Sequence, residues 1–242
     1  YEKWLEKYEQ QEQNLISQSK ITFKYEPEIS IITPVYNESE QLLIDMIESV
    51  RSQTYSKWEL CITYSAGKYI NTLLQYYTNK DRRIKVKLLP ENKDMATNFN
   101  QSLSLATGDF ITILDNNDIL PPFALFEIVK VINNHSDVDF IYSDEDKISE
   151  DGKRFEPHFK PDWSPDTLRS YNYAGHISVF SKDLIKQIGS FRPGFEGSED
   201  YDLILRATEK AKKIVHIPEI LYHRRYSEGH TETDSHNSAR KA

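Results

Sequence analysis

The chain has 242 residues, a formal net charge of −8 at pH 7 and one cysteine. This length fits one large domain or two small ones and can bury a sizeable core. The acidic balance, without a long basic block, argues against a general nucleic-acid-binding protein. Because Cys61 has no second cysteine to pair with in the chain, intrachain disulfides are excluded and a reducing compartment is indicated.

The first segment, residues 1–18, is polar with apolar side chains at roughly helical spacing. It predicts a helix that docks on the domain or on a preceding one. From residue 27 to 142, short apolar strands alternate with amphipathic helices. We predict strands over residues 29–33, 58–63, 84–88, 110–114 and 138–142, and helices over 39–53, 69–77, 94–106 and 121–133. This alternation predicts an α/β fold with a mainly parallel central sheet, right-handed crossovers and helices on both faces.

After Tyr142 the pattern changes. Asp151-Gly152 predicts a hairpin turn between residues 147–148 and 154–155. The proline- and aromatic-rich residues 156–172 predict a long surface segment with little sheet. The remaining predicted elements are a strand over 177–180, a helix capped by Ser181 and ended by Gly189, a helix capped by Ser198 that runs to about Lys212, and extended segments over 215–217 and 221–226.

These elements divide the chain into an N-terminal helix and lead-in over residues 1–26, an α/β domain over 27–228 and a polar tail over 229–242. No apolar stretch is long enough to span a bilayer, and the start carries no visible secretory signal. Because the chain starts without methionine and ends in a polar tail, we expect it to be part of a larger protein.

The apolar run over residues 110–114 ends at Asp115, and Asp118 follows three residues later. Ligands collect at the carboxyl ends of strands in open α/β sheets. Carboxylates there can hold a divalent cation, which in turn can hold a phosphate. The alternative interpretation is a turn rich in Asp and Asn, which tolerate left-handed backbone. This stretch alone leaves both interpretations open.

Two further motifs each have a structural and a functional interpretation. Thr33-Pro34-Val35-Tyr36-Asn37 follows the first predicted strand, and it is either a plain loop or a turn that holds a nucleotide base. Ser198-Glu199-Asp200 begins a predicted helix. These residues alone favour a capped helix start, in which acidic side chains complement the helix dipole. The alternative makes Asp200 or Glu199 a general base at the mouth of a helix.

Two motifs near strand ends are equally open. His223, within Leu221-Tyr222-His223-Arg224-Arg225, is either a structural hydrogen-bonding residue or a ligand for metal or phosphate, and the arginines could pair with phosphate oxygens. The acidic run over residues 143–146 either lines a site or forms a solvated turn.

Taken together and in order, these motifs resemble those of family 2 inverting glycosyltransferases with the GT-A fold. They are most similar to the bacterial rhamnosyltransferase-like enzymes of surface-polysaccharide assembly. The resemblance covers nearly the whole chain. The matching segments are residues 1–4, 31–37, 58–62, 106–110, 141–148, 159–166, 194–198 and 221–223.

The resemblance implies that residues 27–228 are a GT-A glycosyltransferase domain with an acceptor-side segment after the metal motif. It implies transfer of a sugar, with inversion, from a nucleotide-sugar donor to a glycan or lipid-linked glycan acceptor in bacterial surface-polysaccharide assembly. Mn²⁺ or Mg²⁺ is the implied cofactor. The implied location is the cytoplasm, at the inner face of the cell membrane. Neighbouring domains or a membrane-associated assembly complex are the implied further partners, and nucleic acid is not one.

The resemblance also implies roles for residues at matching positions. Asp200 aligns with the base that deprotonates the acceptor hydroxyl, with Glu199 beside it, and Asp115 belongs to the Asp-x-Asp motif. The implied nucleotide-sugar-binding residues are Thr33, Pro34, Tyr36, Tyr64 and Asp115. The implied metal-binding residues are Asp115, Asn117, Asp118 and His223, and the acceptor-side residues are Asp144, Glu145 and Trp163.

Three departures from the family pattern lie on the donor side. Asn117 stands where the second metal-binding carboxylate is usual, and residues 63–67 lack the usual Asp pair, so that Tyr64 is the group available to stack on a base. Residues 92–95 lack the usual glycines.

These departures motivate an alternative function, a catalytically degenerate GT-A module that binds glycan or a partner domain. The aromatic surface for such binding would come from Phe159, Trp163, Tyr171 and Tyr173. A nucleotidyltransferase is a poorer match, because no Gly-rich phosphate loop follows the first strand.

Overall fold

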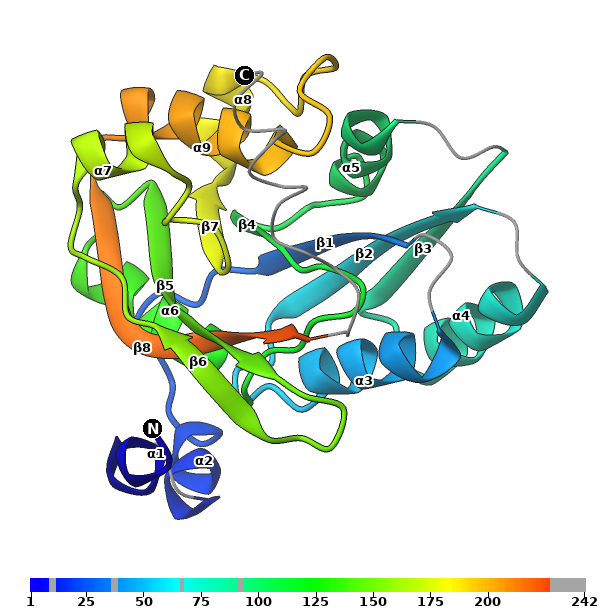
Figure 1. The fold of residues 1–242 in the computed structure, drawn as a ribbon. Coiled ribbons are helices and arrows are strands. Elements are labelled where there is room, and N and C mark those ends of the chain that lie inside the picture. Colours follow the sequence, from blue (N-terminus) through cyan, green and yellow to red (C-terminus); the bar gives the residue numbers. More distant parts are fainter. Residues whose placement is uncertain (9–11, 36–38, 66–67, 91–93, 227–242) are drawn as a thin grey trace.

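The computed structural model describes residues 1–8, 12–35, 39–65, 68–90 and 94–226. Its centre is an eight-stranded sheet with the order β3-β2-β1-β4-β7-β5-β6, in which β8 also pairs with β5 (Figure 1). The strands are β1 (Ile29–Val35), β2 (Trp58–Ser65), β3 (Ile84–Leu89), β4 (Phe110–Ile113), β5 (Phe140–Ile148), β6 (Arg154–His158), β7 (Ser178–Ser181) and β8 (Ile214–Arg225). The helices are α1 (Glu2–Tyr8), α2 (Glu12–Gln18), α3 (Glu40–Arg51), α4 (Lys68–Lys80), α5 (Met95–Leu103), α6 (Ala124–Asn134), α7 (Pro165–Ser170), α8 (Lys182–Ile188) and α9 (Glu199–Lys210).

The sheet is mixed, with its parallel part built from helical crossovers. β1 pairs in parallel with β2 and β4, β2 with β3, and β5 with β8. β7 runs antiparallel to both β4 and β5, and β6 runs antiparallel to β5. The predicted α/β fold and mainly parallel sheet are confirmed, and β7 supplies a reversal of direction in the middle of the sheet.

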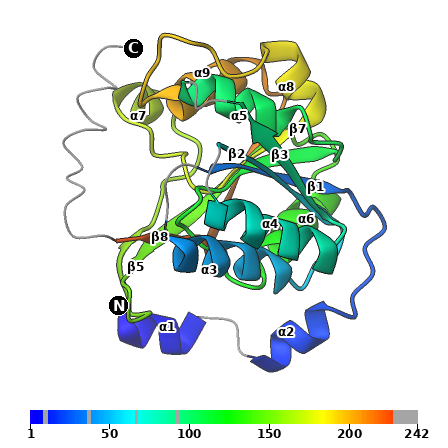
Figure 2. The same cartoon turned by 90° about the vertical axis from the view of Figure 1, so that its right-hand side faces the viewer.

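Helices cover both faces of the sheet, with α3, α4 and α6 on one side and α5, α8 and α9 on the other (Figure 2). Each face has its own apolar cluster. In β1, Ile29 and Ile31 join the first cluster while Ile32 joins the second. Burial on both faces explains why the central strands are continuous apolar runs with no polar alternation.

Several boundaries differ from the prediction. The N-terminal segment forms two helices, α1 and α2, and residues 156–172 contain the end of β6 and the short helix α7. β5 continues through its acidic run to Ile148, because those carboxylates find buried polar partners. The two predicted C-terminal segments form one strand, β8, whose register against β5 shifts between Ser143 and Glu145. Pro218 lies at that irregularity, where a missing ladder hydrogen bond is tolerated.

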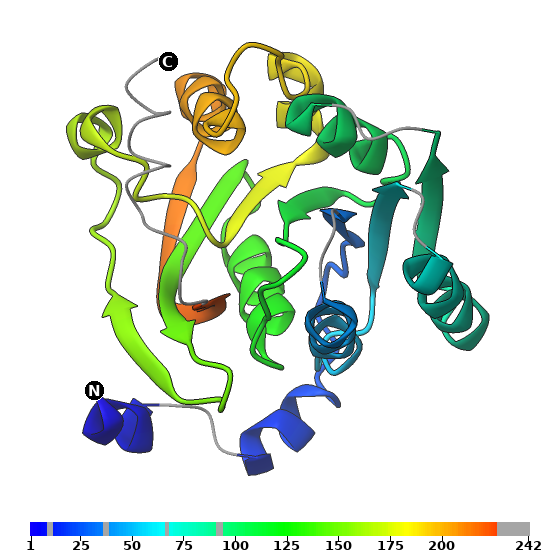
Figure 3. The same cartoon turned by 45° about the vertical axis from the view of Figure 1, so that its right-hand side comes forward.

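The N-terminal helices dock on the domain, beside β6 and α6 (Figure 3). The Tyr1 hydroxyl donates a hydrogen bond to Asp146 at 2.6 Å, and the Trp4 ring lies 5.1 Å from the Phe159 ring. Leu15 packs against the first apolar cluster. Within the described parts of the chain, no helix is both long enough and apolar enough to cross a lipid bilayer.

Gly108 permits a close approach between the start of β4 and the start of β1. A Cβ atom at this position would lie 2.6 Å from the Glu28 carbonyl oxygen and 2.7 Å from Ser30 Oγ. We expect Gly108→Ala to lower the free energy of unfolding by about 2 kcal/mol, the usual cost of overpacking. Urea denaturation measures this loss, with Ser104→Ala on the exposed end of α5 as the control. An unchanged midpoint would contradict the tight packing.

Candidate active site

The site opens where β4 ends before its neighbour does. The register pairs Ile32 of β1 with Ile113, the last residue of β4, while β1 continues to Val35. The Ile32 carbonyl accepts a hydrogen bond from the Leu114 amide, so Pro34, two residues later, faces the side that β4 has left. A proline is tolerated there because no ladder hydrogen bond is lost.

A cavity of about 390 Å³ occupies this position. It brings together five residues predicted from the sequence: Pro34, Asp115, Asn117, Glu199 and Asp200. Its other lining residues are Met95, Phe99, Ile113, Asn116, Gly175, His176, Ser178, Gly197 and Ile204. The volume suits a small-molecule site. Two larger cavities, near the N-terminal helices and at the amino ends of the strands, are lined by none of the predicted site residues.

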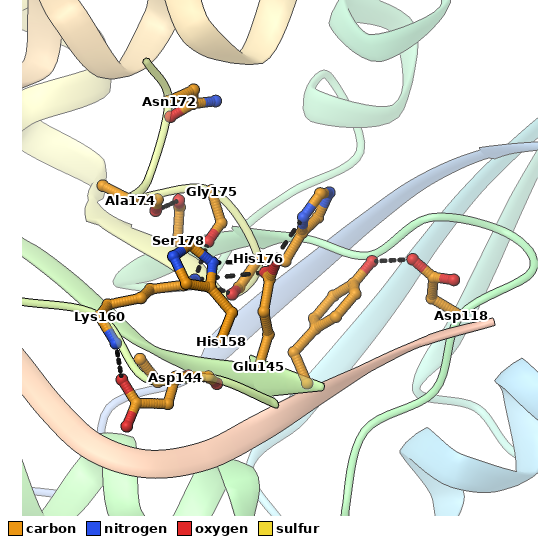
Figure 4. Close-up of polar contacts among 12 residues, drawn as sticks. Asp118, Asp144, Glu145, His158, Lys160, Asn172, Ala174, Gly175, His176 and Ser178 are labelled. Carbon is orange, nitrogen blue, oxygen red and sulfur yellow. Dashed lines mark hydrogen bonds and ion pairs between the residues drawn. The ribbon is translucent and has the colours of Figure 1, made fainter. Parts of the chain in front are cut away.

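Asp115 lies beside His176 in the cavity lining, with His176 Nε2 3.7 Å from Asp115 Oδ2. The other ring nitrogen of His176, Nδ1, lies 3.3 Å from Glu145 Oε2 (Figure 4). Burial alone would lower the pKa of His176, but Glu145 and Asp115 outweigh it and raise the pKa to about 10. Burial likewise opposes ionisation of Asp115, yet His176 and Arg224 hold the pKa of that carboxyl below its ordinary value. His176 therefore carries a positive charge between the carboxylates of Asp115 and Glu145.

Lys160 holds the segment that carries His176. Its ammonium group is buried and donates hydrogen bonds to the carbonyl oxygens of Gly175 and His176, and to Glu145 Oε2 at 3.2 Å. Burial lowers the pKa of Lys160. Burial opposes ionisation of Glu145, but Lys160 and His176 outweigh it and hold its pKa well below the usual range. This buried pairing fixes one wall of the cavity.

Asp118 lies beneath the cavity rather than in it. Its carboxylate accepts hydrogen bonds from the Tyr222 hydroxyl at 2.8 Å and the Arg225 amide at 2.7 Å. Burial, together with the nearby charge of Asp115, raises the pKa of Asp118 to about 7. Only 4 % of Asp118 is exposed. The structure therefore gives this residue internal partners in place of the predicted metal contact.

Asp200 lies in the first turn of α9 and also lines the cavity. Asn172 Nδ2 donates a hydrogen bond to Asp200 Oδ2 at 2.9 Å. Burial is the main cause of the raised pKa of Asp200, and burial also raises that of Glu199. An elevated carboxyl pKa favours proton abstraction near neutral pH. Glu199 and Asp200 begin a helix, as predicted, and both also line the cavity, where a carboxylate can act as a base.

Ser198 does not cap α9 as predicted. It occupies the N-cap position, but its side chain makes no capping hydrogen bond. The Glu199 carboxylate instead accepts a hydrogen bond from the Gly197 amide at 2.8 Å. Gly197 has a φ of +80°, a conformation that glycine adopts at little cost.

Three buried polar atoms around the cavity lack a hydrogen-bond partner among the described residues: Asn116 Nδ2, Asn172 Oδ1 and Ser198 Oγ. Asn116 itself lines the cavity, and Asn172 and Ser198 are close in sequence to lining residues. A buried polar group without a partner costs about 1–3 kcal/mol. Their concentration here supports a site that binds a polar ligand.

Two predicted donor-side residues, Thr33 and Tyr64, do not line the cavity. The Thr33 hydroxyl donates to the Leu114 carbonyl at 2.8 Å and ties β1 to the end of β4. Tyr64 is buried in the first apolar cluster, and its hydroxyl donates to Asn71 in α4 at 2.7 Å, so the predicted stacking on a base is not supported. Tyr36 lies outside the described residues.

His223 and Asp144 also point elsewhere. His223 Nδ1 lies 2.5 Å from Asp146 Oδ1, while its neighbour Tyr222 faces Asp118, because successive residues of a strand face opposite sides. His223 is therefore not placed to bind a metal beside Asp115. Asp144 accepts hydrogen bonds from the Lys160 amide and pairs with His216 at 2.8 Å. These contacts make it a buried structural carboxylate.

On the acceptor side, Glu145 faces His176, as described above. Trp163 is half-buried and packs against the second apolar cluster, outside the cavity lining. Of the predicted acceptor-side residues, Glu145 thus comes nearest to the cavity.

Four residues that contact the predicted site residues were not identified as candidates from the sequence: His176, Lys160, Asn172 and Tyr222. His176 stands immediately before the predicted strand over residues 177–180. Since β7 is antiparallel to β4, its amino end meets the carboxyl end of β4. A search confined to the carboxyl ends of strands overlooks such a residue.

The cavity offers few side chains that could bind a metal ion. In the part of the chain that the structure describes, no group of three or more His, Cys, Asp or Glu side chains is arranged to hold a metal ion. The Asp115 side chain is 46 % exposed, and Asn117, whose amide has an oxygen, lines the same cavity. Mg²⁺ commonly binds through one or two carboxylates together with substrate phosphates. Asp115 and Asn117 fit this mode of binding.

The fold is similar to that of solved glycosyltransferase structures. S. aureus TarS 1–349 in complex with UDP aligns with a TM-score of 0.69 and 21% identity, over 83% of this chain and 61% of that one. The mannosyltransferase PcManGT from Pyrobaculum calidifontis, in complex with GDP-Man and Mn²⁺, aligns with a TM-score of 0.63 and 16% identity, over 90% and 64%. The likeness confirms the predicted GT-A fold.

The model of glycosyl transferase family 2 matches residues 30–189, and the chain belongs to this family. An uncharacterised protein of Sinorhizobium fredii, y4gI, is 43% identical over 207 residues, which cover 84% of this chain and 23% of the relative. The O-antigen biosynthesis protein RfbC of Myxococcus xanthus is 37% identical over 201 residues, which cover 82% and 16%. The chain therefore spans less than a quarter of either relative.

Proposed function

We propose that this domain transfers a sugar, with inversion, from a nucleotide-sugar donor to a glycan or lipid-linked glycan acceptor in bacterial surface-polysaccharide assembly. The observation that carries the proposal is the shared cavity, which both Asp115 and Asp200 line. The name of the Myxococcus relative supports the polysaccharide context, and the UDP and GDP-Man complexes of the structural neighbours support a nucleotide-sugar donor.

Asp200 is the proposed general base. It takes the proton from the acceptor hydroxyl while that oxygen attacks the anomeric carbon of the donor, and the bond to the nucleoside diphosphate breaks in the same displacement. Burial, which raises the pKa of Asp200, strengthens it as a base. Asn172 orients its carboxylate through the hydrogen bond at 2.9 Å, and Glu199 lines the cavity beside it.

Asp115 and Asn117 would hold Mn²⁺ or Mg²⁺ on the donor side, with Pro34 lining the cavity next to them. Such a cation supplies charge stabilisation to a departing diphosphate. His176 and Arg224 add positive charge near Asp115, as the lowered pKa of that carboxyl indicates.

The degenerate binding module is the weaker candidate. A binding module has no need of a carboxylate with a raised pKa, Asp200, in the same cavity as the half-exposed Asp115. Several matched relatives are named as glycosyltransferases, synthases or biosynthesis proteins.

We further propose that the domain works in the cytoplasm at the inner face of the cell membrane, with neighbouring domains or an assembly complex as partners. The neighbouring domains are supported by the length of the relatives, of which this chain spans only a small share.

Turnover of a panel of UDP-, GDP- and dTDP-sugars with Mn²⁺ present tests the proposed function. We expect slow hydrolysis or transfer of at least one donor by the wild-type domain. If no donor in the panel is consumed, the transferase proposal fails.

Asn117→Asp tests the sparse metal site. Restoring the carboxylate adds a negative ligand at the cavity wall, so we expect Mn²⁺-dependent nucleotide affinity to increase about tenfold, the effect of one charge-assisted contact. Calorimetry at several Mn²⁺ concentrations measures the change, and Asn134→Asp, which adds the same charge at the exposed end of α6, provides the control. Equal affinity in Asn117→Asp and wild type would mean that Asp115 already suffices.

A further inference from the structure

An exposed aromatic pair lies next to the proposed catalytic base. Tyr171, which follows α7, is 41 % exposed. Its ring lies 6.3 Å from the ring of His158 at an interplanar angle of 29°, with the hydroxyl 3.4 Å from Nε2. Tyr173 is fully buried and lies 6.1 Å behind Tyr171. Tyr171 and His158 therefore form an exposed aromatic surface, and the buried ring of Tyr173 packs near Tyr171.

Two separate connections lead from this pair to residues of the cavity lining, although His158 itself lines a smaller neighbouring cavity of about 210 Å³. Asn172, the residue after Tyr171, donates its hydrogen bond to Asp200. On the other side, His158 Nδ1 lies 3.7 Å from Glu145 Oε1, and Glu145 contacts His176 in the cavity wall (Figure 4). Asn172 therefore connects Tyr171 to the base, and Glu145 connects His158 to His176 in the cavity lining.

The other aromatic side chains of this segment are engaged elsewhere. Phe159 points to the opposite side of its strand from His158 and packs on Trp4 of α1. Trp163 packs against the second apolar cluster, and Tyr142 is fully buried beside Tyr173. Tyr171 and His158 are therefore the aromatic pair of this segment that combines exposure with proximity to Asp200.

We propose that the Tyr171–His158 face binds the second sugar ring of an oligosaccharide acceptor whose terminal ring presents its hydroxyl to Asp200. A sugar ring has an apolar C–H face that packs on an aromatic ring, while its hydroxyls need hydrogen-bond partners at the rim. Tyrosine supplies both an apolar body and a polar tip. The Tyr171 hydroxyl and His158 Nε2, 3.4 Å apart at the exposed surface, are the adjacent hydrogen-bonding groups. This inference rests on the proposed function.

The test compares Tyr171→Ala with Tyr171→Trp, which restores an aromatic face. Tyr69→Ala is the control, because Tyr69 is 79 % exposed on α4, at the other end of the sheet (Figure 1). Saturation-transfer difference NMR detects binding of a panel of mono-, di- and trisaccharides of hexoses, 6-deoxyhexoses and N-acetylhexosamines. Calorimetry with UDP, GDP and dTDP is run on the same samples.

We expect the wild type and Tyr69→Ala to bind disaccharides better than the corresponding monosaccharides. Tyr171→Ala should lose about tenfold in disaccharide affinity, the loss of one aromatic anchor, and Tyr171→Trp should recover it. Nucleotide affinity should be equal in all four proteins. A structural role for Tyr171 would lower nucleotide affinity as well, and would overturn the inference.

The two proposals fail in different ways. If nucleotides bind but no saccharide does, or if Tyr171→Ala binds disaccharides as well as the wild type, the acceptor surface is overturned and the transferase proposal stands. If no nucleotide binds while disaccharides bind through Tyr171, the proposed function fails and the saccharide surface stands.

Discussion

Asp200→Asn should lower the rate of sugar transfer about a thousandfold, because removing a general base costs 10²–10⁴ in rate. Donor binding should remain intact, since the base acts on the acceptor hydroxyl. Asparagine is close in shape to aspartate, so the contact with Asn172 can persist. Initial rates with a saturating donor measure the loss, and calorimetry measures nucleotide affinity.

Glu199→Gln is the matched control for Asp200→Asn. Glu199 is the neighbouring carboxylate of the same helix turn, and it accepts a hydrogen bond from the Gly197 amide. We expect a clearly smaller loss of rate than in Asp200→Asn. Weakened nucleotide affinity in Asp200→Asn would contradict its assignment to the acceptor.

The wild-type enzyme should also show the raised pKa of Asp200 in its pH profile. A base works only when it is deprotonated, so the rate should fall as the pH falls through this pKa. Because burial raises the pKa, that fall should begin at a higher pH than for an ordinary aspartate.

The second large effect is expected from Asp115→Ala. Its carboxylate is the exposed acidic group on the donor side of the cavity, so its removal should weaken Mn²⁺-dependent nucleotide binding about a hundredfold, as for a charged contact. Asp118→Asn is the control, because Asp118 is bound internally by Tyr222 and Arg225. An equal loss of affinity in both variants would mean that Asp118, too, reaches the ligand.

The order of strands and helices could be predicted because each element is long enough to show its own periodicity. Asp115 could be located because it follows a buried strand, whereas Asp200 was assigned through the family resemblance, since its own residues favour a helix cap. Both are brought to the cavity by general rules of α/β folds, in which strand ends and helix starts gather at one edge of the sheet.

The direction of side chains along the acidic and C-terminal strands could not be predicted. β5 and β8 have partners on both faces, so no apolar–polar alternation shows that Glu145 and Tyr222 face the site while Asp144 and His223 do not. His176 was missed for a different reason. Its role depends on the antiparallel direction of β7, which short apolar runs do not reveal.

Calorimetric titration of the wild-type domain with UDP, dTDP and GDP, each with and without Mn²⁺, tests the central claim most directly. The claim is that Asp115 and its neighbours form a nucleotide-sugar site. We predict binding of one nucleoside diphosphate that depends on Mn²⁺ and identifies the class of donor. No binding of any of the three, with or without the metal, would contradict it.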